Sequence, residues 1–301
     1  MFAKFKLELL TLNSFFHLHF LRQYYYEAGK NLFERQKPSV HKMLDSYLDP
    51  DGVMVAENIE ENWFPHINAH VFFSHSHQDE LMVTCLAGYL AKEFGILSFI
   101  DSLVWDCADD LLKQIDDAHC RRNYKIRISN KVYEKHAYNY GLRNQSTAHV
   151  HLILQSALAK MINNTECLIF LNTPASLNVS DIGDKATTSS AWIYNELLMA
   201  CTFPPRVPER YKVLKGTAHD SVLSENTKQF IKIKYPVPVE KFEILEMNDF
   251  VTANKMVEAK IYSGALKKDE SKRPIRVLHE LYVNKKIFTQ NINEQYDIIN
   301  H

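Results

Sequence analysis

The chain has 301 residues, 46% of them hydrophobic, so it is long enough to bury a sizeable core in one large domain or in one domain with added segments. Its 35 Lys and Arg residues nearly balance 36 Asp and Glu residues, so we expect neither nucleic acid nor a membrane among its partners. Eight glycines and ten prolines are too few for a turn-rich β-sandwich or barrel, and a helix-rich protein is favoured.

The cysteines and the N-terminal residues indicate the cellular compartment. The five cysteines are odd in number and include no CxxC pair, which argues against a disulfide framework and a zinc ribbon and fits a reducing compartment. Charged and polar residues interrupt every apolar run in the first 30 residues, and no small-residue cleavage site follows. We therefore predict a cytoplasmic protein.

The first 65 residues are predicted to form a helical N-terminal extension. Leu, Phe and Tyr recur there at mixed spacings of three and four, with a break at Lys37-Pro38 and a turn around Asp51. The pattern indicates two helices. The aromatic residues between 15 and 26 are expected to form a packing face, within the chain or against a second subunit.

Residues 66–262 show the pattern of an α/β domain. An apolar strand at 69–73, a helix at 81–94 ended by Gly95, and a second strand at 96–100 form a βαβ unit, which is typical of a parallel sheet. Further elements are expected as helices at 149–163 and 190–201 and as strands at 167–171 and 229–235. We predict a flavodoxin-like parallel sheet flanked by helices.

Two further segments complete the expected organisation. A long insertion at about 102–148 contains a helix at 108–118 and a charged, tyrosine-rich stretch, and a connection of this length is usually functional. Residues 263–301 are predicted to form a helical C-terminal extension, in which 274–286 is the clearest helix.

Polar residues follow the predicted strands at the sheet edge where ligands of doubly wound sheets bind. They lie at 74–79, at 101–105 and in the segment leading to Trp192, and we expect them to converge. Trp192 and Glu196 are four residues apart and share one face of their helix. Such a pair alone is weak evidence, because a helical glutamate is far more often a solvated surface residue than a catalyst.

Three stretches in this order resemble the bacterial branch of the Toll/interleukin-1 receptor (TIR) family: VFFSHSHQDE, LAGYLAKEFGILSFIDSLVW and SSAWIYNEL. The resemblance covers about residues 69–201. Several bacterial members consume NAD or convert it to cyclic ADP-ribose signals in antiphage systems such as Thoeris. The resemblance implies that Glu196 is catalytic. It also implies nucleotide contacts from Ser74, His75, Asp101 and Trp105. With Ser190 and Trp192, which lie near Glu196 on the same helix, these residues form the expected substrate-binding set.

The implied reaction breaks the bond between nicotinamide and ribose, with NAD as the substrate and no cofactor. Nicotinamide leaves as a neutral base, so no general acid is needed, while the ribose develops oxocarbenium character. An ionised Glu196 beside the ribose would stabilise that charge, and Trp192 or Trp105 would exclude water. Attack by water gives ADP-ribose, and attack from within the dinucleotide gives a cyclic product. The resemblance also implies a homo-oligomer and a downstream effector that senses the product.

The sequence also allows two other functions. A TIR-like module can assemble with like domains without catalysis, since fold does not settle function. A transferase acting on nucleosides could use a related sheet. The insertion at 102–148 is much longer than the usual TIR loop, which leaves the substrate contacts and the product open. The histidines around His70 do not predict a metal site, because strand neighbours point to opposite faces, and no P-loop or Rossmann glycine pattern occurs.

Overall fold

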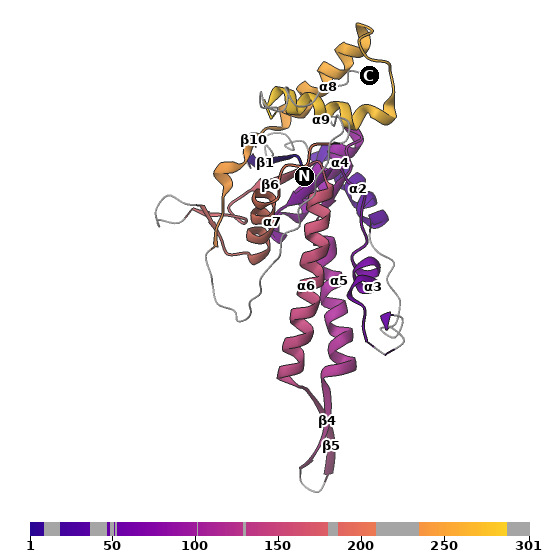
Figure 1. Cartoon of the computed structure of the whole chain (residues 1–301), viewed down its shortest axis with the longest axis vertical. Coiled ribbons are helices and arrows are strands. Elements are labelled where there is room, and N and C mark those ends of the chain that lie inside the picture. The colour runs from indigo at the N-terminus through magenta and orange to yellow at the C-terminus, as the bar shows by residue number, and fades with distance from the viewer. Residues whose placement is uncertain are drawn as a thin grey trace. The chain divides into compact units, whose positions relative to one another are not determined.

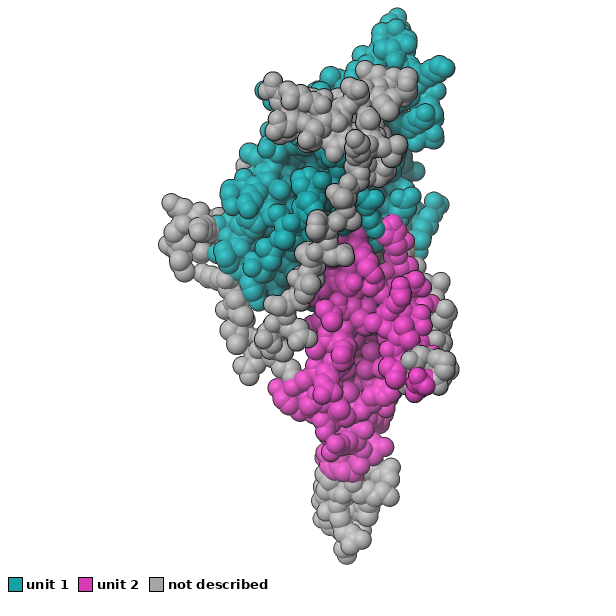
Figure 2. Space-filling view, viewed as in Figure 1, with its two compact units in different colours: residues 1–35, 67–101, 161–301 teal, residues 36–66, 102–160 magenta. Residues whose placement is uncertain are grey.

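The computed structural model describes residues 1–8, 19–36, 47–48, 51, 53–100, 102–128, 131–179, 186–208 and 235–287. The chain forms two compact units, shown in different colours in Figure 2. Unit 1 comprises Met1–Arg35, Ile67–Asp101 and Met161–His301, and unit 2 comprises Gln36–His66 and Ser102–Lys160. None of the helices within the described ranges is long and apolar enough to cross a membrane.

Unit 1 is built on a parallel sheet of five strands in the order β10-β1-β6-β2-β3. In that order the strands are Glu243–Leu245, Ala3–Glu8, Cys167–Asn172, Val71–Ser74 and Ser98–Ile100. With β1 set aside, the remaining strands follow the flavodoxin order, and β1 occupies its fourth place. The predicted flavodoxin-like parallel sheet is therefore confirmed. A second, antiparallel sheet consists of β7 (Asn178–Val179), β8 (Ala186–Thr188) and β9 (Tyr235–Pro236).

The prediction that residues 1–65 form a purely helical extension is wrong at residues 3–8, which form strand β1. Residues 3–8 read Ala-Lys-Phe-Lys-Leu-Glu, a strict alternation in which Ala3, Phe5 and Leu7 are buried and the charged residues are half-buried. Because β1 lies between β6 and β10, its apolar side chains enter the core of the sheet. The alternation has period two, which a helix cannot use.

Helices cover both faces of the sheet (Figure 1). One face packs against a core that includes side chains of α2, α4, α8 and α9. On the other face α7 lies against β2, where Phe72 and Ser74 point. Among the described residues of unit 1, the α-helices are α2 (His19–Gln36), α4 (Glu80–Phe94), α7 (Ala191–Thr202), α8 (Met247–Tyr262) and α9 (Arg273–Asn284), and short 3-10 helices lie at His77–Asp79, Val239–Lys241 and Glu270–Lys272. The predicted end of α4 is confirmed, since Gly95 adopts a left-handed conformation with φ 69° and caps the helix.

Helices α2 and α4 approach closely because each contributes a glycine to the contact. A Cβ built on Gly29 would lie 2.0 Å from the carbonyl oxygen of Thr84, and one on Gly88 would lie 1.9 Å from that of Tyr25. Any larger residue would force the helices apart. The rings of Tyr25 and Tyr89 pack edge to face beside this contact, with centroids 5.1 Å apart.

Unit 2 contains the whole of the predicted insertion at 102–148. Its elements are α3 (Ala56–Trp63), α5 (Ser102–Ile115), a π-helical turn (Asp116–Cys120), β4 (Arg121–Ile128), β5 (Lys131–Tyr138) and α6 (Tyr140–Asn164), whose last residues belong to unit 1. Figure 1 shows α5 and α6 side by side, with the β4–β5 ribbon continuing from their ends. The predicted helices at 108–118 and 149–163 exist, but they start six and nine residues earlier than expected. The ribbon itself was not predicted.

Candidate functional site

The candidate site lies at the carboxyl ends of β2 and β6. In a flavodoxin-like order these two neighbouring strands mark the point where the direction of winding reverses, and ligands of such sheets bind there. β2 ends at Ser74, and β6 ends at Asn172. The residues that follow these strands are therefore the candidates for ligand binding and catalysis.

Ser74 and Glu196 meet at this edge, as the sequence predicts. The Ser74 hydroxyl donates a hydrogen bond of 2.6 Å to Oε2 of Glu196, across 122 residues of chain. Both side chains have an exposed fraction of 0%. A short hydrogen bond to a carboxylate is among the stronger polar contacts in a protein, and this one fixes α7 against the end of β2.

The start of α7 explains why Glu196 reaches the strand end. Ser190 is the N-cap, and its hydroxyl accepts a hydrogen bond of 3.3 Å from the amide of Ile193. The Ser190 amide in turn donates to the Thr188 hydroxyl at 3.1 Å. Ser190 was expected to contact substrate, whereas its hydroxyl here caps the helix that carries Glu196. Trp192 lies one turn before Glu196 and is half-buried.

A second polar group at the same edge escaped the sequence analysis. Thr173, the residue after β6, donates from its hydroxyl to Oδ2 of Asp79 at 2.5 Å. The Thr173 amide donates to the Ser176 hydroxyl at 2.9 Å, and that hydroxyl donates to the carbonyl of Leu171 at 2.7 Å. These contacts join the end of β6 to the start of α4. Only the polar residues at 74–79, which include Asp79, hinted at them.

β1 adds an acidic residue that no motif predicts. Glu8 ends the strand, and its Oε2 accepts a hydrogen bond of 2.8 Å from the side-chain amide of Asn172. Lys6 forms an ion pair of 3.9 Å with the same carboxylate. Since β1 was not expected in the sheet, neither residue was a candidate.

The other predicted residues have different outcomes. His75 follows Ser74 and is buried, with an exposed fraction of 4%. Asp101 lies outside the described residues, and so does the side chain of Trp105 on α5.

No cation site is evident in the part of the chain that the structure describes. It contains no group of three or more His, Cys, Asp or Glu side chains arranged to hold a metal ion. His70, one of the histidines considered for such a site, accepts a hydrogen bond of 3.0 Å from the Leu97 amide through its Nδ1.

Burial limits what the site can do in this arrangement. A carboxylate with no exposed surface cannot contact the ribose of a dinucleotide unless the residues above it move. The hydrogen bond from Ser74 keeps the carboxylate oriented toward the strand end.

Comparisons with protein-family models, curated proteins and solved structures found no match for this chain.

Proposed function

We propose that unit 1 is a TIR-like enzyme that cleaves NAD at its nicotinamide-ribose bond, with Glu196 as the catalytic carboxylate. The observation that carries the proposal is the 2.6 Å contact between Ser74 and Glu196 at the end of β2. Two motifs that lie 122 residues apart and were predicted to converge do so at the ligand-binding edge of a flavodoxin-like sheet.

The chemistry needs one carboxylate beside the sugar. As nicotinamide leaves, positive charge develops on the ribose, and an ionised Glu196 placed next to it would lower the barrier. Ser74 is a positioning residue, because its hydrogen bond to Oε2 fixes the carboxylate from the strand side. Water then yields ADP-ribose, or an intramolecular attack yields a cyclic product that an effector senses.

Full burial of Glu196 adds a condition to this proposal. The substrate must enter while the residues covering the carboxylate move, and closing over the dinucleotide would exclude water from the reacting sugar. Assembly of several copies is one event that could drive such a movement. We therefore propose that the protein acts as a homo-oligomer in the cytoplasm, where NAD is supplied.

The test is release of nicotinamide from NAD by the purified full chain, followed by chromatography, with the nucleotide product identified by mass spectrometry. Glu196→Gln should abolish release. Glu243→Gln, an exposed residue of β10, is the matched control and should leave release unchanged. A wild-type protein that stays inactive, both alone and with phage lysate added as a trigger, would refute the enzymatic proposal.

The same burial favours a second candidate, a non-catalytic interaction module in which Glu196 only holds α7 on the sheet. Under this alternative Glu196→Gln lowers stability while NAD remains intact with both proteins. Self-association measured by light scattering would then be the activity to follow. Nicotinamide release by the wild type and not by the variant decides for the enzyme.

A further inference from the structure

The β4–β5 ribbon concentrates positive charge. Residues 121–138 contain six Lys or Arg residues and a single acidic residue, Glu134. The rest of the chain then holds 29 basic residues against 35 acidic ones, so the nearly neutral total hides a strong local asymmetry. The expectation of no polyanionic partner was drawn from that total, and it does not apply to this segment.

The charged side chains of the ribbon that the structure describes are open to solvent. Arg121, Arg122 and Lys135 are exposed, as is His136. Among the residues with described side chains, none forms an ion pair with these three cations. Tyr124 is also exposed, at 45%, so an aromatic ring with a hydroxyl stands among the cations.

The ribbon has the dimensions of a groove-binding element. β4 and β5 are eight residues each and pair in antiparallel register from Arg121–Tyr138 to Ile128–Lys131. Eight residues at about 3.4 Å each extend roughly 27 Å. A two-stranded β-ribbon fits the major groove of B-form DNA, which is about 12 Å wide.

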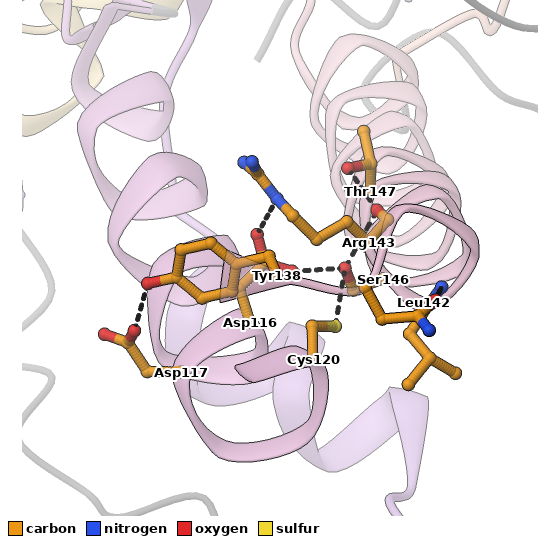
Figure 3. A network of polar contacts seen from close by, with 9 residues as sticks. Asp116, Asp117, Cys120, Tyr138, Leu142, Arg143, Ser146 and Thr147 are labelled. Carbon is orange, nitrogen blue, oxygen red and sulfur yellow. Dashed lines mark hydrogen bonds and ion pairs between the residues drawn. The ribbon is translucent and has the colours of Figure 1, made fainter. Parts of the chain in front are cut away.

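Polar contacts hold the base of the ribbon on the helices of unit 2 (Figure 3). Asp116 is buried and accepts hydrogen bonds of 2.8 Å from Nε of Arg143 and 2.5 Å from the Ser146 hydroxyl. The Tyr138 hydroxyl donates a hydrogen bond to Asp117, and the guanidinium of Arg143 lies over the Tyr138 ring, 5.2 Å from its centroid. The Asn139 amide donates to the carbonyl of Cys120 at 2.8 Å. The ribbon is therefore presented in a fixed direction on a helical support.

We propose that the β4–β5 ribbon binds duplex DNA, with the exposed side chains of Arg121, Arg122 and Lys135 on the phosphates flanking the major groove. Association with the ribbon of a second copy is disfavoured, because two segments of the same positive charge repel each other. Single strands bind mainly by stacking successive bases on several aromatic rings, and among the described side chains of the ribbon Tyr124 alone has an open ring, because Arg143 lies over the ring of Tyr138. Double-stranded RNA is disfavoured because its major groove is too deep and narrow for a ribbon. The proposal is independent of NAD cleavage.

The test measures binding of the full chain to a fluorescent DNA duplex of about 20 base pairs, two helical turns, by anisotropy. A triple variant, Arg121→Gln, Arg122→Gln and Lys135→Gln, should raise Kd at least about tenfold and lower the slope of log K against log salt by roughly 2.7 between about 50 and 200 mM. The matched control removes three exposed cations elsewhere: Lys267→Gln, Lys268→Gln and Lys272→Gln. Its Kd should stay within about twofold of the wild type, since these residues contact no phosphate.

Three further arms make the result decisive. Arg121→Lys with Arg122→Lys keeps the charge and should keep the binding, which separates loss of charge from damage to the ribbon. The single strand of the same sequence, and phosphatidylserine vesicles, should bind more weakly than the duplex. Equal loss in the ribbon variant and the control, tighter binding of the single strand, or binding of vesicles without binding of the duplex would each overturn the proposal.

Discussion

The contact between Ser74 and Glu196 should make a measurable contribution to stability. Ser74→Ala removes the hydroxyl that lies 2.6 Å from Oε2 and leaves a carboxylate with no exposed surface short of a donor. Hydrogen bonds to charged groups contribute about 1.5–3 kcal/mol, so unfolding free energy should fall by that amount. Ser189→Ala, an exposed neighbour of the α7 cap, should change it by less than about 0.5 kcal/mol.

A double-mutant cycle isolates the pair. Glu196→Met keeps roughly the size of the side chain and removes the oxygen that accepts from Ser74, so the two substitutions together should cost less than their sum. We expect a coupling free energy of about 1 kcal/mol or more, measured by urea unfolding followed by tryptophan fluorescence at constant m value. A coupling within about 0.3 kcal/mol of zero would show that the two side chains do not interact, and both proposed roles of Glu196 would lose their support.

Two more predictions concern the packing of unit 1. Phe5→Ala should lower the free energy of unfolding by about 3–5 kcal/mol, because the Phe5 ring is fully buried and stacks on Tyr282. Lys4→Ala on the same strand is the control. An equally small effect of both substitutions would contradict the place of β1 inside the sheet. Burial, with a hydrogen bond to Glu93, raises the pKa of Tyr25 from its ordinary 10.0 to about 12. The folded protein therefore favours the protonated phenol. The resulting stabilisation is complete below pH 10 and is lost as the pH rises toward 12. Tyr25→Phe should therefore flatten the decline of the urea midpoint over that interval, and parallel curves for the two proteins would disprove the assignment.

Parts of the fold follow from the sequence because their local patterns are strong. The helix that ends at Gly95 and the strands on either side of it are predicted within a few residues, since the left-handed cap and the apolar runs act locally. The same holds for α7, which begins after Ser190 as a capped helix should. These elements bring Ser74 and Glu196 to one edge.

Other parts depend on distant partners. The alternation of residues 3–8 is compatible with a strand, but only pairing with β6 and β10 gives the strand a place in the sheet. The depth of Glu196 was equally hidden, because helical spacing puts Trp192 and Glu196 on one face and does not tell which one is buried. The ribbon escaped because charged, tyrosine-rich residues resemble a solvated loop until two such segments pair.

The position of β1 affects how the protein folds during synthesis. Its neighbour β6 is 164 residues further along the chain, so at roughly 5–20 residues per second the ribosome needs about 8–33 s to supply that partner. Until then Phe5 and Leu7 have no sheet to enter, and the nascent segment is exposed to aggregation. The central sheet can close only after β10 has also emerged, which makes completion of unit 1 a late event.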